Sequence, residues 1–250
     1  SLMQAISLGD TLTVIKSFED SFTCSDPSLS CDQSNLVMQA VTLFRQKTNS
    51  FFPIKIHLEK KIPKEAGLGG GSSNLATTLW ALNQFLKKPY STKILKNWAA
   101  ELSSDAPFFF SSGTGYASGR GESIKDIHPP MDLPSLWIAK PAFELKTPQV
   151  YDNFNPTYFN DIKDPYQMIK KVMQAPCKAT NDLESASFFL KPKLKEVKHG
   201  LLRIGFKHVL MTGSGTAFYC LGPVIEPSLK DVIFYPVNSI SRRSDNWYCT

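Results

Sequence analysis

The sequence lacks several features that define large classes of proteins. No apolar run approaches the roughly 18 residues that a membrane-spanning helix needs. The first ten residues, S-L-M-Q-A-I-S-L-G-D, have neither the charged-then-apolar order of a signal peptide nor the arginine content of a transit peptide. These absences predict a cytoplasmic protein that does not bind membranes.

Cysteine is scarce and has no metal-site spacing. The five cysteines are odd in number and form no C-x-x-C pair; they are Cys24, Cys31, Cys177, Cys220 and Cys249. The four histidines, His57, His128, His199 and His208, do not form a ligand set either. The sequence therefore predicts neither a disulfide framework nor a zinc site, and it favours a reducing compartment.

Positive charge exceeds negative charge only moderately. The 28 basic and 22 acidic residues give a net charge of +6, which suits anionic ligands such as nucleotides. The paired basic residues are far apart along the chain and are predicted to be solvated; they are Lys60-Lys61, Lys87-Lys88, Lys170-Lys171 and Arg242-Arg243. We therefore expect no nucleic-acid partner.

A glycine-rich stretch between Lys60 and Asn83 dominates what is present. Gly67, Gly69, Gly70 and Gly71 follow an alternating, strand-like run and precede an apolar-periodic helix that Ser72 opens. Glycine tolerates positive φ, so such a loop can turn several N–H groups toward one point. The helix start adds unpaired N–H groups and a positive dipole end. The pattern predicts a phosphate site, and a capped helix after a flexible turn is the alternative.

Two familiar phosphate motifs are absent from this stretch. No lysine follows the glycines, so it is not the P-loop G-x-x-x-x-G-K-[ST]. The chain also has no H-R-D, D-F-G or V-A-I-K, which excludes the protein-kinase signature. The two hydroxyls at Ser72 and Ser73 are more than a helix cap requires, and a hydroxyl beside phosphate is a natural Mg²⁺ ligand.

Strands and helices are expected to alternate irregularly along the chain, which favours α+β over a doubly wound sheet. Strands are predicted at 11–18, 54–59, 113–119, 136–141, 209–211, 217–221 and 232–240, and residues 19–34 are predicted to form a loop. Helices are predicted from Asn35, from Ser72, over 92–102, 147–154 and 165–174, and from Asn181 with a break at Pro192. A proline-rich linker at His128–Asp132 predicts domains at 1–130 and 131–250.

The run P-K-E-A-G-L-G-G-G-S-S-N resembles the phosphate motif of the GHMP kinase superfamily, and further matches cover nearly the whole chain. S-S-D-A-P-F-F-F resembles the motif G-x-D-x-P-x-F, T-P-Q-V-Y resembles T-x-x-V-[YF], and T-G-S-G resembles the third glycine motif. The resemblance implies a ribosomal-protein-S5-domain-2-like N-terminal domain and a ferredoxin-like C-terminal domain. It also implies an ATP- and Mg²⁺-dependent kinase of isoprenoid precursor synthesis, acting on a cytidine diphosphate ester.

The resemblance assigns roles to individual residues. The catalytic base is Asp105, and Ser73 is the metal ligand. The implied nucleotide-binding residues are Pro63, Lys64, Glu65, Ala66, Gly67, Leu68, Gly69, Gly70, Gly71, Ser72, Ser73 and Asn74. The implied substrate-binding residues are Lys146, Thr147, Tyr151, Thr212, Gly213 and Ser214, with Tyr151 stacking on cytosine.

Each assignment has a simpler alternative. Asp105 could be an ordinary residue after a helix, Tyr151 could pack into the C-terminal core, and T-G-S-G could be a plain turn. The segment Asn181-Asp182-Leu183-Glu184 matches an N-D-L-E signature and is predicted to be a helix cap and domain contact.

The sequence also departs from the family pattern. Family members begin with A-K-[IL]-N, which carries a lysine, and continue with D-G-[YF]-H; neither motif is present here. The resemblance thus implies that a strand is missing, and we expect these 250 residues alone to be catalytically weak. Homoserine or mevalonate specificity and a non-catalytic role in binding nucleotide or nucleic acid remain alternatives, and monomer and homodimer are both open.

Overall fold

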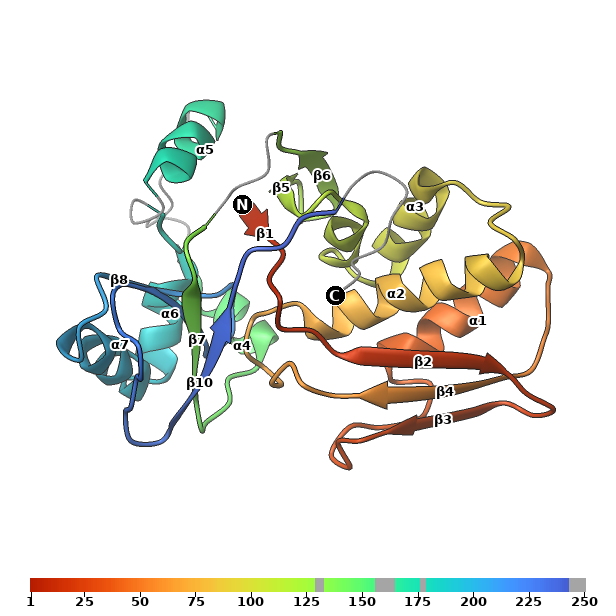
Figure 1. Ribbon diagram of the computed structural model, residues 1–250, viewed down its shortest axis with the longest axis horizontal. Helices are drawn as coiled ribbons and strands as arrows, with labels where there is room; N and C mark the ends of the chain where they lie inside the picture. Colours follow the sequence, from red (N-terminus) through yellow and green to blue (C-terminus); the bar gives the residue numbers. More distant parts are fainter. Residues whose placement is uncertain (129–132, 156–164, 176–178, 243–250) are drawn as a thin grey trace. The chain divides into compact units, whose positions relative to one another are not determined.

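The computed structural model describes residues 1–128, 133–155, 165–175 and 179–242. The chain falls into two units (Figure 1). Unit 1 comprises Ser1–Ile62, Gly69–Pro130 and Ile240–Thr250, and unit 2 comprises Pro63–Leu68 and Met131–Ser239. The functional domains 1–130 and 131–250 remain a prediction. The two structural units do not divide at residue 130 alone, because unit 2 includes Pro63–Leu68 and unit 1 includes Ile240–Thr250.

Unit 1 contains two small sheets and three main helices. In the first sheet β4 (Ile54–Glu59) lies between β2 (Thr11–Lys16), which is antiparallel to it, and β3 (Ser21–Cys24), which is parallel. The second sheet has the order β1 (Leu2–Gln4), β5 (Thr114–Ser118), β6 (Ser123–Asp126). The helices α1 (Leu36–Thr48), α2 (Gly70–Phe85) and α3 (Thr92–Leu102) lie on one side of the first sheet, and a short 3-10 helix, η1 (Ala106–Phe110), follows α3 (Figure 1).

The core of unit 1 follows directly from sequence periodicity. Ile54, Ile56 and Leu58 alternate along β4 and are all buried, whereas the residues between them are exposed. Leu75 and Leu79 recur at helical spacing on α2 and are fully buried in the same cluster. This packing fixes the direction in which α2 leaves the end of β4.

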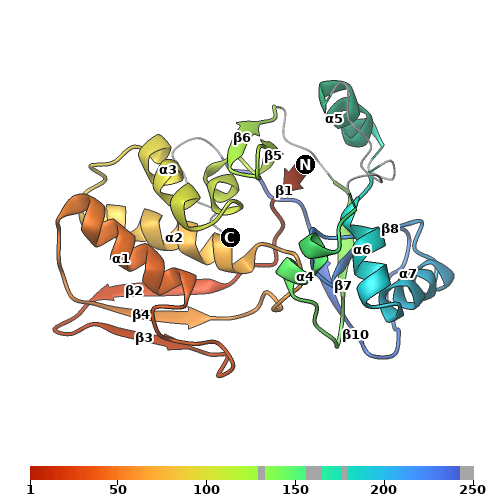
Figure 2. The same ribbon diagram turned by 180° about the vertical axis from the view of Figure 1, so that it is seen from behind.

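Unit 2 is built on one antiparallel sheet with the order β10 (Val232–Val237), β7 (Leu136–Pro141), β9 (Phe218–Leu221), β8 (His208–Met211). Its helices are α4 (Thr147–Asp152), α5 (Pro165–Gln174), α6 (Leu183–Leu190) and α7 (Lys193–Arg203), seen from behind in Figure 2. Buried Val150, Leu194, Leu201 and Phe218 join α4, α7 and the sheet in one cluster.

Most predicted elements are confirmed. The strands at 54–59 and 136–141 and the helices at 92–102 and 165–174 have the predicted bounds, and Pro192 separates α6 from α7. Residues 19–34 are not simply a loop, because β3 pairs with β4 there. The helix expected from Ser72 begins at Gly70, and β1 and β6 were not expected.

The basic residues are less uniformly solvated than predicted. Lys87 and Lys88 are exposed, but the Lys60 side chain is only 10% exposed and pairs with Asp10 at 2.5 Å. Arg242 donates hydrogen bonds to the carbonyls of Ser111 and Phe110. The prediction for Arg243 lies outside the described residues. Buried acceptors therefore hold two of these cations, contrary to expectation.

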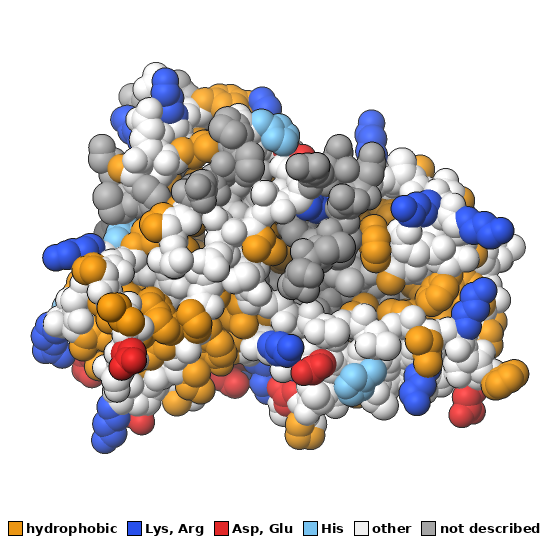
Figure 3. All heavy atoms as spheres, in the orientation of Figure 1, with side chains coloured by type: hydrophobic (Ala, Val, Ile, Leu, Met, Phe, Trp, Pro, Cys, Tyr) orange, Lys and Arg blue, Asp and Glu red, His pale blue; other side chains and the backbone are white. Residues whose placement is uncertain are grey.

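The surface shows dispersed charge. On the face in Figure 3, lysine and arginine side chains stand apart from one another, and hydrophobic side chains gather around β10. Ile225 and Ile233 are among the exposed hydrophobic residues of this unit. Within the described ranges, every helix is too short or too polar to cross a membrane.

Candidate functional site

The glycine-rich segment is divided between the two units. Pro63–Leu68 belongs to unit 2, whereas the residues from Gly69 onward belong to unit 1. Each half is held by contacts within its own unit, so the two halves are described separately.

In unit 1, the segment turns into α2 at Gly69. Gly69 is the N-cap with φ +66°, a left-handed conformation that favours glycine, and its carbonyl accepts from the Ser73 N–H at 2.8 Å. The preceding N–H groups of the first turn have no acceptor within the helix. An ideal Cβ on Gly70 would lie 3.4 Å from Lys60 Nζ, so this ammonium lies near the helix start. Backbone donors, helix dipole and ammonium together favour an anion here.

A buried carboxylate organises this helix start. The Asp10 side chain is 1% exposed and accepts from Lys60 Nζ, from the N–H groups of Lys61 and Ile62 at 2.8 Å each, and from Asn74 Nδ2 at 2.8 Å. It thereby ties the end of β4 to the first turn of α2. Asp10 was not among the expected site residues, because its place beside Gly9, before a strand, gave no sign of these partners.

The two serines of the motif differ in environment. Ser72 is buried and its Oγ lies 2.8 Å from Ser103 Oγ, whereas Ser73 is half-buried in the first turn. A single hydroxyl beside phosphate oxygens fits Mg²⁺, which typically takes few protein ligands and keeps several waters. No group of three histidine, cysteine or carboxylate side chains forms a metal centre among the residues that the structure describes.

In unit 2, the other half of the segment packs against the turn that follows β8. The N–H groups of Thr216 and Ala217 donate to the carbonyls of Glu65 (3.1 Å) and Ala66 (3.3 Å), and Thr212 Oγ1 donates to Ala66 O at 2.6 Å. The structure thus brings the predicted residues Ala66, Thr212 and Gly213 into one cluster. Thr216, which is fully buried, was missed.

Two glycines make this contact possible. An ideal Cβ on Gly67 would lie 1.9 Å from Thr212 O, and one on Gly215 would lie 2.0 Å from Gly67 N. Gly67 also has φ +73°. The turn 212–215 is therefore more than a plain β-turn, because its backbone packs directly against the backbone of Ala66 and Gly67.

Asp105 lies at the N-cap of η1 in unit 1. Its N–H donates to Ser103 Oγ at 3.3 Å, and its Oδ1 faces Gly121, where an ideal Cβ would lie 3.5 Å away. The residue retains solvent exposure, but the protein atoms crowded around its carboxyl desolvate it and raise its pKa. A carboxyl with a raised pKa beside open solvent is suited to accepting a proton.

The predicted substrate residues of unit 2 cluster in part. Ser214 is buried, and its hydroxyl donates to Thr147 Oγ1 at 3.0 Å at the start of α4, directly after the exposed Lys146. Tyr151 is 60% exposed, while its neighbour Val150 is fully buried. The alternative in which Tyr151 packs into the core is therefore wrong.

Similarity to known proteins identifies the class of protein to which this chain belongs. Residues 35–113 match the family model for the N-terminal domain of GHMP kinases. A solved structure of 4-(cytidine 5'-diphospho)-2C-methyl-D-erythritol kinase is similar over 97% of this chain and 90% of that one, with a TM-score of 0.74 and 28% identity. The expected two-domain α+β GHMP kinase fold is confirmed.

Two curated relatives show to which family within the GHMP kinases the chain belongs. The chain is 45% identical over 251 residues to 4-diphosphocytidyl-2-C-methyl-D-erythritol kinase of Protochlamydia amoebophila (strain UWE25), covering 100% of this chain and 84% of the relative. It is 38% identical over 266 residues to the chloroplastic enzyme of that name from Mentha piperita, covering 99% of this chain but 65% of the relative's length. The chain belongs to the 4-diphosphocytidyl-2-C-methyl-D-erythritol kinase family of GHMP kinases.

Proposed function

We propose that this protein transfers the γ-phosphoryl group of ATP to the 2-hydroxyl of 4-diphosphocytidyl-2-C-methyl-D-erythritol, in the non-mevalonate route to isoprenoid precursors. The observation that carries the proposal is the start of α2, where the first N–H groups have no acceptor within the helix and the left-handed Gly69 provides no side-chain cap. Family membership supports the choice of substrate, since both curated relatives are named as kinases of 4-diphosphocytidyl-2-C-methyl-D-erythritol.

The residues Pro63–Asn74 are proposed to hold the ATP phosphates. Backbone N–H groups at the helix start bind the phosphate oxygens, and the Lys60 ammonium, which is paired with Asp10, lies nearby as a further donor. Ser73 is proposed to hold Mg²⁺ together with phosphate oxygens and water, and this ion neutralises charge on the phosphates when bound.

Asp105 is proposed to orient the substrate hydroxyl and accept its proton. The hydroxyl oxygen then bonds to the γ-phosphorus, the bond from that phosphorus to the β,γ-bridging oxygen breaks, and ADP leaves with the electron pair. The raised pKa of Asp105 makes it a stronger base than an ordinary carboxylate. Tyr151 is proposed to stack on cytosine, for which its exposed ring is available.

The proposed setting is a reducing aqueous compartment such as the cytoplasm. Cys24, Cys31 and Cys220 are free thiols in the described part of the chain, and burial raises the pKa of Cys220 to about 12. Cys177 and Cys249 lie outside the described residues. A thiol with so high a pKa is almost wholly protonated at neutral pH and does not react readily.

The decisive experiment compares acceptor alcohols under MgATP. Phosphorylation of the cytidine diphosphate ester, with homoserine and mevalonate inert, is the expected result. Turnover of homoserine or mevalonate instead overturns the choice of substrate. Binding of MgATP without turnover of any acceptor, both in these 250 residues and in a chain extended by the family's N-terminal A-K-[IL]-N segment, indicates a non-catalytic relative. Affinity for single-stranded DNA that falls steeply with salt indicates nucleic-acid binding instead.

A further inference from the structure

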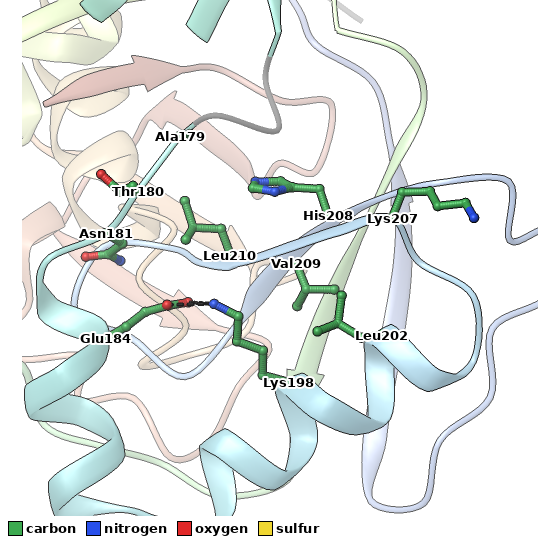
Figure 4. Close-up of a pocket in the computed structure, with 10 residues that line it drawn as sticks. All are labelled: Ala179, Thr180, Asn181, Glu184, Lys198, Leu202, Lys207, His208, Val209 and Leu210. Carbon is green, nitrogen blue, oxygen red and sulfur yellow. Dashed lines mark hydrogen bonds and ion pairs between the residues drawn. The ribbon is translucent and has the colours of Figure 1, made fainter.

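The segment Asn181–Glu184 has no role in the proposed chemistry, yet Asn181 and Glu184 line a pocket of unit 2 (Figure 4). The pocket has a volume of about 370 Å³ and is lined by α6, α7 and β8. Glu184 from α6 and Lys198 from α7 face one another across it, while Lys207 points away. On the β8 side the pocket is lined by residues 207–210, and Met211 and the turn 212–215 follow them in the chain.

Asn181 joins the start of α6 to that turn. Its Nδ2 donates to the carbonyl of Met211 at 2.8 Å and to the carbonyl of Gly213 at 2.7 Å, while its Oδ1 accepts from Leu183 N–H at 2.9 Å. The oxygen caps the helix and the amide nitrogen holds the turn. Different atoms of the Asn181 side chain make these two kinds of contact, so a substitution can remove one and keep the other.

Glu184 fixes the same strand end from one turn further along α6. Its Oε1 accepts from Met211 N–H at 3.0 Å, and its carboxylate pairs with Lys198 Nζ at 2.9 and 2.7 Å. Both side chains are largely buried, at 14% and 22% exposure. The backbone on both sides of Met211 is therefore clamped to α6.

The opposite side of the turn 212–215 packs against Ala66 and Gly67, which belong to the proposed nucleotide-binding segment Pro63–Asn74. Thr212 Oγ1 donates to Ala66 O, and the Gly215 and Gly67 backbones leave no room for a single methyl group between them. Close-packed backbone cannot be displaced on one side without moving the other. A shift of the turn 212–215 must therefore shift Ala66 and Gly67.

We propose that Asn181 is a positioning residue for nucleotide binding, acting through Met211 and Gly213 on the turn 212–215 and through that turn on Ala66–Gly67. The inference rests on the proposed function, in which Pro63–Asn74 binds the ATP phosphates. It assigns to Asn181 of the N-D-L-E segment a role in nucleotide affinity in addition to that of a helix cap.

The test is Asn181→Ser, because serine keeps a capping oxygen but has no amide to hold the turn. Asp182→Asn is the matched control, since Asp182 adjoins the same helix start and its side chain forms no capping bond. MgATP affinity is measured by calorimetry, KM for each substrate by steady-state kinetics, and Tm by scanning calorimetry. Loss of two hydrogen bonds is expected to raise the MgATP Kd and KM on the order of tenfold.

KM for the cytidine substrate should rise less than the MgATP Kd, since Ser214 of the same turn keeps its hydrogen bond to Thr147. All values for Asp182→Asn should stay near those of the wild type. An unchanged MgATP Kd in Asn181→Ser overturns the inference, as does a change in the cytidine KM alone. A wild type that binds MgATP but does not phosphorylate the cytidine ester refutes the proposed function, while the Kd comparison still decides the role of Asn181. A wild type that binds no MgATP refutes both.

Discussion

Asp105 shows how local crowding sets the chemistry of a single residue. The surrounding protein disfavours its charged form, so its pKa in the folded chain lies above the ordinary 3.8. As the pH rises above 3.8, Asp105 loses its proton in the unfolded chain while it still holds the proton in the folded chain. Stability therefore falls with rising pH through this window, because the folded state binds more protons there.

Asp105→Asn is expected to lower kcat by at least about 100-fold, because the hydroxyl loses its proton acceptor. The free energy of unfolding at pH 7 should equal or exceed that of the wild type, since a desolvated charge is removed. Any stability advantage should shrink as the pH falls through the raised pKa of Asp105, because the wild-type carboxyl becomes protonated there. Steady-state kinetics and urea unfolding across pH 4–8 measure both effects. The control is Glu19→Gln, at an exposed carboxylate of the same unit.

Tyr151 offers a second test at this scale. Removing the ring in Tyr151→Ala is expected to raise KM for the cytidine substrate about tenfold, because base stacking on an aromatic ring is lost. Tyr151→Phe keeps the ring and should bind as the wild type does. KM for ATP and Tm should change little, since the side chain is 60% exposed. Equal cytidine KM values in all three proteins would rule out stacking.

At the scale of elements, the turn between β8 and β9 and the segment Pro63–Leu68 act as one packed unit. Two backbone hydrogen bonds from Thr216 and Ala217 and side-chain bonds from Thr212 and Thr216 join them. The contact depends on the missing side chains of Gly67 and Gly215. Since backbone lies on both sides, neither position can relax by rotating a side chain.

Gly215→Ala is expected to destabilise the protein by about 1–3 kcal/mol, the usual cost of overpacking, and to weaken MgATP binding. Gly9→Ala is the matched control, because an ideal Cβ there meets nothing within 4 Å and its φ is not in the left-handed region. Tm and MgATP affinity of the two variants measure the difference. Identical behaviour would mean that the close approach of Gly67 and Gly215 has no energetic consequence.

At the scale of the whole molecule, the chain enters unit 2 after Ile62, returns to unit 1 at Gly69, and crosses again near residues 130 and 239. The proposed nucleotide segment is therefore shared between two folding units. Nucleotide binding should stabilise the native molecule through mass action, because the unfolded chain cannot assemble this segment.

MgATP at about 100 times its Kd should add roughly 2.7 kcal/mol of stability, a rise in Tm of about 5–10 °C for a chain of this size. Scanning calorimetry with MgATP, MgCl₂ alone and MgCTP separates nucleotide binding from effects of salt. The rise should be much smaller in Gly215→Ala at the same MgATP concentration. A Tm that does not respond to MgATP would contradict phosphate binding at Pro63–Asn74.

Features that depend on near neighbours in the chain follow from the sequence alone. Alternation along 54–59 was sufficient to place β4 and its buried face, Asn35 marked the start of α1, and Pro192 separated two helices. The glycine run marked the segment where a helix starts with unpaired N–H groups. Such features are set within a few residues, where steric and hydrogen-bonding rules act directly.

Contacts between residues far apart in the chain became visible in the folded molecule. The burial of Asp10 among donors 50 to 64 residues away, and the fit of Gly215 on Gly67, leave no trace in local patterns. The same holds for β3, a short Ser-Phe-Thr-Cys strand that exists because β4 lies beside it. These contacts depend on loop closure and on packing between elements, which local propensity does not specify.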